Sequence, residues 1–181
     1  MNLDLTGKSA LVCGSTAGIG KAIAKELAEM GASLVLMARN EEKLKTAVSE
    51  MDNSKGQQHS YVVADFSDVS TVKTAVESIQ NPIHILINNT GGPPGGPIID
   101  ADVREFVSAF SMHLLCNHTL VQGVKQGMID SGYGRIINII STSVKIPLTG
   151  LGVSNTVRGA VGNWAKTMAN ELGVHGITVN N

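Results

Sequence analysis

The sequence is poor in aromatic residues, in net charge and in long apolar runs, and each shortage excludes a class of function. Aromatic residues make up only 3% of the 181 residues, and 15 acidic side chains balance 14 basic ones. The resulting net charge of −1 predicts no basic surface for nucleic acid or for an anionic membrane. No apolar run approaches the roughly 20 residues of a transmembrane helix, and residues 1–8 contain no secretory h-region.

Cysteine is scarce as well, because Cys13 and Cys116 are the only two in the chain. Two cysteines in apolar surroundings are typical of buried, reduced thiols and exclude a disulfide scaffold. We therefore expect a cytoplasmic protein. The sequence also gives no grouping of side chains that predicts a metal site. With 43% hydrophobic and 16% charged residues, a single domain over residues 1–181 with a buried sheet is favoured.

What the sequence does contain is a glycine-rich turn between two apolar segments. Residues 10–13 form a continuous apolar run, as in a strand buried on both faces. Gly14, Gly18 and Gly20 follow in the spacing G-x-x-x-G-x-G, and a helix is expected over residues 21–30 with one apolar stripe: Ile19, Ile23, Leu27 and Met30. Such a turn lets phosphate groups approach the backbone and the helix N-terminus, so it favours nucleotide binding. The alternative is a turn that only reverses the chain.

Strands and helices alternate along the whole sequence. We expect strands at residues 10–13, 32–38, 61–64, 83–87, 136–140 and 177–179. Helices are expected at residues 41–51, 69–79, 103–129 and 154–172, in addition to the helix at 21–30. Alternation of this kind predicts a doubly wound parallel sheet of the Rossmann type, with helices on both faces in three α/β/α layers. Ligands of such sheets bind at the carboxyl ends of the strands.

Two charged residues follow the second and third predicted strands. Arg39 lies about twenty residues after the glycine turn, where a side chain that reads the ribose belongs. A cation there favours a 2′-phosphate, and thus NADP over NAD, unless Arg39 is only a solvated surface residue. Asp65 is placed to accept a hydrogen bond from an adenine amino group. Alternatively Asp65 caps the next helix, although Ser67 or Asp68 is equally suited to that cap.

Polar residues also follow the fourth and fifth predicted strands. Asn88 and Asn89 either hold the backbone between these two strands or serve only as turn residues. Ser141 opens a Ser-Thr-Ser segment that faces the region where a nicotinamide would lie, unless the segment is simply a polar loop.

Four motifs in order resemble the short-chain dehydrogenase/reductase family, especially its 3-oxoacyl-carrier-protein-reductase-like branch. They are Gly14-x-x-x-Gly18-x-Gly20, Asp65-Phe66-Ser67-Asp68, Asn88-Asn89-Thr90-Gly91 for the family's Asn-Asn-Ala-Gly, and residues 134–141. The resemblance implies hydride transfer between C4 of a nicotinamide and a small carbonyl or alcohol substrate. It implies NADP, with NAD as the alternative, and a homodimer or homotetramer formed through the helices 103–129 and 154–172. The implied cofactor-binding residues are Gly14, Ser15, Thr16, Gly18, Ile19, Gly20, Arg39, Asp65, Phe66, Asn89 and Gly91.

The sequence departs from the family in its catalytic set of Asn, Ser, Tyr and Lys. Ser141 matches the serine, but Ser154 stands in the tyrosine's place, Arg158 in the lysine's place and His113 in the asparagine's place. A phenol with a pKa near 10 can be brought toward neutrality by a neighbouring cation, whereas an aliphatic hydroxyl cannot. Arg158 keeps the charge but does not release a proton. The proton shuttles left are His113, which is otherwise a buried structural histidine, and Lys145, which is otherwise a solvated loop cation.

Two functions therefore compete. The first is an NADP-dependent oxidoreductase with an altered proton-donor arrangement. The second is a catalytically silent dinucleotide-binding protein that senses the cofactor or serves as a partner subunit. A methyltransferase that uses the glycine turn for S-adenosylmethionine fits Arg39 and residues 88–91 poorly. Because family members run to about 250 residues, we also expect the C-terminal part of the family fold to be missing, through truncation or because the ordered part ends there.

Overall fold

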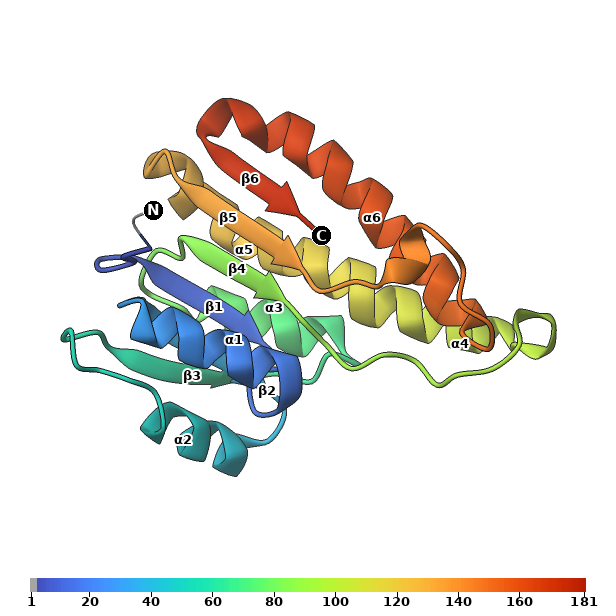
Figure 1. Ribbon diagram of the computed structural model, residues 1–181, viewed down its shortest axis with the longest axis horizontal. Coiled ribbons are helices and arrows are strands. Elements are labelled where there is room, and N and C mark those ends of the chain that lie inside the picture. Colours follow the sequence, from blue (N-terminus) through green and yellow to red (C-terminus); the bar gives the residue numbers. More distant parts are fainter. Residues whose placement is uncertain (1–2) are drawn as a thin grey trace.

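The computed structural model describes residues 3–181 and contains one six-stranded parallel sheet (Figure 1). The strands lie in the order β3-β2-β1-β4-β5-β6. Their bounds are β1 Ser9–Cys13, β2 Ser33–Ala38, β3 His59–Val63, β4 Ile85–Asn88, β5 Gly134–Asn138 and β6 Ile177–Asn180. The chain winds outward from β1 to β3 and then returns to β4 on the other side of β1. This reversal opens a crevice at the carboxyl ends of β1 and β4.

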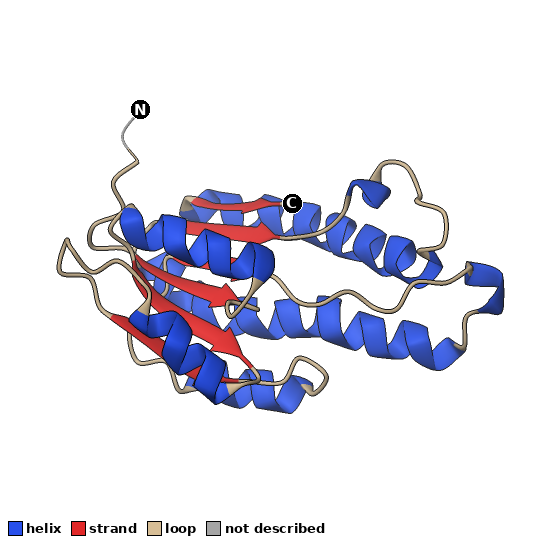
Figure 2. Ribbon diagram, turned by 60° about the horizontal axis from the view of Figure 1, so that its bottom comes forward, coloured by secondary structure: helices blue, strands red, loops and turns tan. Residues whose placement is uncertain are grey.

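Helices cover both faces of the sheet and complete the three layers expected for a Rossmann-type fold (Figures 1 and 2). One face carries α1 (Gly18–Glu29) and α2 (Glu41–Ser49). The other face carries α3 (Val69–Glu77), α5 (Cys116–Asp130) and α6 (Gly152–Leu172). The helix α4 (Val103–Phe110) extends past the carboxyl edge of the sheet and packs against α6 (Figure 1). Each layer of helices encloses its own apolar core against the sheet. The two central cores contain fully buried side chains such as Leu11 and Leu36.

The first helix differs from its expected form in both its start and its buried face. It begins at Gly18 rather than at residue 21, and Ile19 is 60% exposed rather than part of the apolar stripe. The buried residues of α1 are Gly20, Ala24 and Ala28. Ile23 and Leu27 of the expected stripe are half-buried and pack against the same core. Glycine and alanine lie closest to the sheet because the helix leaves the turn close to β1, as the contacts of Gly20 below show.

The helix expected over residues 103–129 is not regular. A π-helical turn at Ser111–Leu115 separates α4 from α5. Each π turn inserts one residue into the helical repeat and rotates the faces on either side of it. Phe110 shares the three- and four-residue apolar spacing of this segment, which predicts an inward position, yet it is 41% exposed, whereas His113 is only 3% exposed. Periodicity counted at 3.6 residues per turn cannot detect this change of phase.

The remaining differences are small and lie at element ends. The expected strands shift by up to two residues at each end, and α2 and α3 each end two residues early. Tyr61, in the strand expected at residues 61–64, lies within β3 and donates from its hydroxyl to Glu41, 3.0 Å away. Cys13 and Cys116 are both free and buried, as expected, and burial raises the pKa of both thiols.

Candidate functional site

The glycine turn after β1 is packed so tightly that two of its positions exclude any side chain. A Cβ on Gly20 would lie 2.3 Å from the carbonyl oxygen of Gly14, and a Cβ on Gly14 would lie 2.6 Å from that of Asn89. Gly14 and Gly18 also have φ values of +58° and +54°, in the region that favours glycine. The amide of Asn89 donates to the carbonyl of Cys13 at 3.2 Å and to that of Gly14 at 3.4 Å. Backbone contacts and the Asn89 amide therefore fix the shape of the turn, and the N-terminus of α1 lies beside it.

A pocket of about 360 Å³ lies beside this turn at the carboxyl ends of β1 to β4. Its lining residues come from four separate strand ends and, for Met112, from the π-helical turn: Gly14, Thr16, Ala38, Arg39, Ala64, Asp65, Phe66, Ser67, Thr90, Gly91, Gly92 and Met112. Six of the predicted cofactor residues are thus brought together. The sequence reasoning did not single out Thr90, Gly92 or Met112. Thr90 is the one that the sequence could have revealed, because it replaces the alanine of the family motif.

Other predicted cofactor residues serve the turn rather than the pocket wall. Ser15 is fully buried, and its hydroxyl donates to the carbonyl of Met37 at 3.4 Å. Ile19 stands exposed on the first turn of α1. Asn89 holds the turn after β1, and Asn88 instead donates to the Asn138 side chain of β5 at 2.8 Å. The expected link between the fourth and fifth strands is therefore made by Asn88 alone.

Arg39 and Asp65 stand beside each other at the ends of β2 and β3. The carboxylate of Asp65 accepts from the backbone N–H of Ser67 at 2.9 Å. Hydrogen bonds from Ser67, and to a smaller extent the charge of Arg39, lower the pKa of Asp65. The cap of α3 is provided by Asp68, and that of α2 by Asn40. Asp65 is thus an ionised acceptor in the pocket wall rather than a helix cap.

His113 faces the pocket region from the π-helical turn. Its Nδ1 lies 2.9 Å from the hydroxyl oxygen of Thr90, and its Nε2 is buried with no hydrogen-bond partner among residues 3–181. Burial, and then the charge of Arg158, lowers the pKa of His113 to about 4. At neutral pH the ring is uncharged, so it can exchange hydrogen bonds with a ligand but does not act as a cation.

Arg158 reaches from α6 to the ends of β4 and β5. Its Nη1 donates to the carbonyl of Ile139 at 2.6 Å, and its Nη2 lies 3.8 Å from the position that a Cβ on Gly92 would take. The segments that follow β4 and β5 are tied together nearby, since the N–H of Gly96 donates to Gly150 at 2.7 Å. The structure therefore brings His113 and Arg158 into one neighbourhood.

The two serines predicted to be catalytic belong to the same segments as that neighbourhood, since Ser154 precedes Arg158 by about one turn of α6 and Ser141 follows Ile139 by two residues. Ser141 caps a short 3₁₀ turn, where its hydroxyl oxygen accepts from the N–H of Ser143 at 3.1 Å. Its hydroxyl proton stays available for a ligand. Ser141 and Lys145 line a hollow of about 930 Å³ between β5, β6 and α6. Ser154 is half-buried on the first turn of α6.

A histidine whose pKa falls on folding makes stability depend on pH. Unfolded His113 binds a proton below about pH 6.5, whereas the folded chain excludes it until about pH 4. The unfolded state thus binds more protons between these two pH values. The contribution of His113 to the free energy of unfolding is therefore fully present above pH 6.5 and decreases as the pH falls toward 4. The loss amounts to about 3 kcal/mol. In urea titrations at pH 7.0 and 4.5, His113→Gln is expected to remove most of this loss.

The matched change His175→Gln, at an exposed position, should keep the pH dependence of the unmodified protein. An equal pH dependence in His113→Gln and the unmodified protein would mean that the ring is protonated in the folded state.

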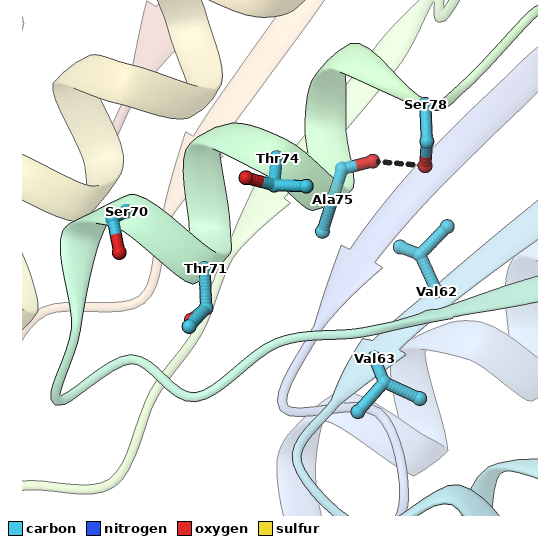
Figure 3. Close-up of a pocket in the computed structure, with 7 residues that line it drawn as sticks. All are labelled: Val62, Val63, Ser70, Thr71, Thr74, Ala75 and Ser78. Carbon is cyan, nitrogen blue, oxygen red and sulfur yellow. Dashed lines mark hydrogen bonds between the residues drawn. The ribbon is translucent and has the colours of Figure 1, made fainter.

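A further hollow, of about 470 Å³, opens at the edge strand β3 and is lined by valine, alanine, serine and threonine side chains, with no acid, base or thiol among them (Figure 3). Of the hydroxyls that line it, Thr71 donates to backbone carbonyls at Asp65 and Asp68, and Ser78 donates to Ala75. Within residues 3–181, no group of three acidic, histidine or cysteine side chains is arranged to hold a metal ion. None of the helices described has the length and apolar character needed to cross a bilayer.

The match to known proteins covers nearly the whole chain. The family model for short chain dehydrogenases matches residues 8–181. The chain is 35% identical to gluconate 5-dehydrogenase of Gluconobacter oxydans over 180 residues, which cover 98% of this chain and 70% of that protein. It is 30% identical to a 3-oxoacyl-[acyl-carrier-protein] reductase of Aquifex aeolicus, covering 99% of this chain and 74% of that one.

Solved structures agree with this match. The crystal structure of L-sorbose reductase from Gluconobacter frateurii, complexed with NADPH and L-sorbose, superposes with a TM-score of 0.93 at 30% identity. The superposition covers 99% of this chain and 70% of that one. The order of strands, the glycine turn and these matches lead to one conclusion: the chain belongs to the short-chain dehydrogenase family.

Proposed function

We propose that the chain is an NADP-dependent oxidoreductase that acts on a small carbonyl or alcohol substrate, with Ser154 and Arg158 in place of the usual tyrosine and lysine. The observation that carries this proposal is the glycine turn packed against Asn89, which opens onto a pocket that also contains Arg39. No other hollow among the described residues combines a helix N-terminus, a cation at the end of β2 and an acceptor at the end of β3.

The residues of this pocket fit a dinucleotide. The free N–H groups at the start of α1 suit the pyrophosphate. Gly14 and Gly20 allow α1 to begin this close to β1 and Asn89, because a side chain at either position would collide with the turn. Arg39 suits a 2′-phosphate, and Asp65 suits the adenine amino group. L-sorbose reductase was crystallised with NADPH, and a gluconate 5-dehydrogenase of Burkholderia cenocepacia with NADP and tartrate, which supports NADP here. When bound, the nicotinamide exchanges a hydride at C4 with the substrate.

The chain's own residues supply hydrogen bonds and charge to the substrate. The hydroxyl proton of Ser141 is available to a substrate oxygen, because its oxygen lone pair already accepts from Ser143. The unpartnered Nε2 of His113 supplies a second hydrogen bond. Arg158 supplies a fixed positive charge that stabilises negative charge developing on the substrate oxygen. Ser154 contributes a hydroxyl that does not ionise near neutral pH.

The second candidate function is a silent dinucleotide-binding protein, and the exchange at Ser154 favours it. The pocket at the strand ends contains Arg39 and Asp65, whereas Ser154 supplies no phenol that could donate a proton. Both candidates bind NADPH, and only the oxidoreductase oxidises it. The test is a titration with NADPH and NADH, followed by NADPH oxidation in the presence of acetoacetyl thioesters and small ketones. Failure to bind either dinucleotide would rule out both candidates.

Arg39 gives the sharpest test of the cofactor choice. Replacing Arg39 by alanine is expected to weaken NADPH binding about 10- to 100-fold, because a charged hydrogen bond to phosphate contributes about 1.5–3 kcal/mol. NADH affinity should change less than two-fold, since NADH lacks the 2′-phosphate. Fluorescence titration of both dinucleotides measures the ratio. An equal loss for both would place Arg39 against a part of the cofactor that they share.

A partner and a cellular location are part of the proposal. Four large apolar side chains stand exposed on α4 and its extension through the π turn: Val103, Val107, Phe110 and Leu115. An exposed apolar face of this kind is suited to a second copy of the chain, which supports the homodimer or homotetramer expected through this helix and α6. The free thiols at Cys13 and Cys116 support a cytoplasmic location.

A further inference from the structure

Arg158 is a partly buried cation without a counter-ion. No carboxylate of residues 3–181 lies within ion-pair distance of its guanidinium. One hydrogen bond, to Ile139, is the only one it makes to the described part of the chain, although a guanidinium has five N–H donors. Burial lowers its pKa, with no acid to offset the effect. Because arginine does not deprotonate in proteins, this position is stabilised only by an anion or by water from outside.

His113 adds a second unused polar atom beside this charge. The charge of Arg158 contributes to the low pKa of His113, so the two groups lie close enough to interact. Thr90 engages Nδ1, which leaves Nε2 on the opposite side of the ring, buried and without a partner in the described chain. If the Thr90 hydroxyl donates to Nδ1, then Nε2 carries the proton and is a donor, like Arg158.

The three residues are also among the positions at which the chain departs from the family pattern, together with Ser154. Thr90 replaces the alanine of Asn-Asn-Ala-Gly, His113 the asparagine and Arg158 the lysine. They come from three segments that are distant in sequence. Thr90 nevertheless contacts His113, and the charge of Arg158 lowers the pKa of His113. A single exchange would be explained by local packing, whereas three exchanges that meet indicate one altered site.

Thr90 lines the cofactor pocket, and neighbours of the other two residues lie where that pocket meets a second hollow. Gly92, next to Arg158, and Met112, next to His113 in sequence, line both the cofactor pocket and a neighbouring hollow of about 560 Å³. That hollow is walled by the Gly-Pro segment after β4 and by α4. Its acids are already engaged at the exposed rim, where Asp102 pairs with Arg104 at 2.9 Å and Glu105 accepts from the backbone of Asp102.

We propose that Thr90, His113 and Arg158 form a carboxylate site, so that the substrate is an oxo acid or hydroxy acid rather than an uncharged carbonyl compound. The inference rests on the proposed function, because it names the substrate class of the same site. Arg158 binds the carboxylate through its unused N–H groups, His113 donates from Nε2, and Thr90 fixes the ring and its tautomer. The neighbouring hollow takes the rest of the acid.

The test compares acids with their methyl esters on the protein saturated with NADP⁺, so that no turnover occurs. The probes are 2-oxo acids from pyruvate to 2-oxohexanoate, and calorimetry gives each dissociation constant. At least one acid is expected to bind ten-fold or more tightly than its ester. Arg158→Met should reduce that ratio to two or less, and Thr90→Ala should reduce it in part. Lys73→Met, which removes an exposed charge on α3, should leave it unchanged.

A spectroscopic readout accompanies the binding constants. The Nε2 signal of His113 in a ¹⁵N spectrum should shift as the acid is added and should not shift with the ester. Equal affinities for acids and esters, absence of any acid binding, or an acid preference that survives in Arg158→Met would each overturn the proposal. So would Arg158→Met weakening NADP⁺ and not the acid, because the guanidinium would then serve the cofactor.

The outcome separates this inference from the proposed function. If the esters are reduced by NADPH as fast as the acids, the carboxylate site is wrong and the oxidoreductase stands. If NADP⁺ itself does not bind, the proposed function fails. The binding of the acids and their esters is then measured on the protein without NADP⁺. A ten-fold preference for an acid over its ester that Arg158→Met removes would still support the carboxylate site, and equal affinities would overturn it.

Discussion

Replacing Ser154 by tyrosine together with Arg158 by lysine is expected to raise the rate of NADPH oxidation with an acetoacetyl thioester at least 100-fold. The physical reason is the proton donor, since a positioned general acid of suitable pKa contributes about 10²- to 10⁴-fold. A phenol beside a lysine reaches that range, and the aliphatic hydroxyl of Ser154 does not. An uncharged thioester is chosen because the rate with an acid substrate would also fall if the replacement of Arg158 weakened carboxylate binding.

Two matched variants isolate the phenol hydroxyl. Ser154→Phe with Arg158→Lys adds the same ring without the hydroxyl and should stay at the rate of the unmodified protein. Ser154→Ala should change the unmodified rate less than two-fold. A substantial rate in the unmodified protein that Ser154→Ala abolishes would show that the serine itself donates the proton. A folded, NADPH-binding tyrosine variant with no gain would mean that proton supply does not limit the reaction.

The sheet and the cofactor pocket could be predicted from the sequence because both depend on short-range patterns. A buried parallel strand is a continuous apolar run, such as Ala10–Val12, and each strand end brings one polar residue to the same edge. Arg39 and Asp65 could therefore be placed in one pocket without knowledge of any contact. Element ends were less certain, since capping depends on single side chains such as Asn40 and Asp68.

The surroundings of His113 could not be predicted in the same way. The π-helical turn at Ser111–Leu115 leaves no trace in the 3.6-residue periodicity, yet it decides that His113 is buried against Thr90. Ile19 fits the apolar stripe on spacing alone, but the close approach of α1 to β1 puts glycine and alanine on the buried face. Both failures have one cause: packing between segments distant in sequence overrides the local pattern.

Replacing Gly20 by alanine is expected to weaken NADPH binding at least 100-fold and to lower the stability of the chain. The new Cβ would lie 2.3 Å from the Gly14 carbonyl oxygen and 2.7 Å from the Asn89 amide nitrogen. Contacts that short cannot persist, so α1 must move away from the turn by about an ångström. A displacement of that size in a site that positions its ligand through backbone groups costs on the order of 100-fold. The overpacking itself costs about 1–3 kcal/mol of folding free energy.

The control is Gly159→Ala, because Gly159 lies within α6 and a Cβ there meets no atom within 4 Å. It should keep NADPH affinity and raise stability by about 0.5–1 kcal/mol, the usual gain when alanine replaces a helical glycine. If Gly20→Ala does not fold, Asn89→Ala answers the same question without a clash. It removes the hydrogen bonds that hold the turn and should weaken NADPH binding about ten-fold. Unchanged NADPH affinity in both site variants would mean that the dinucleotide does not bind at the glycine turn, because a ligand held by these backbone groups must respond when either support is altered.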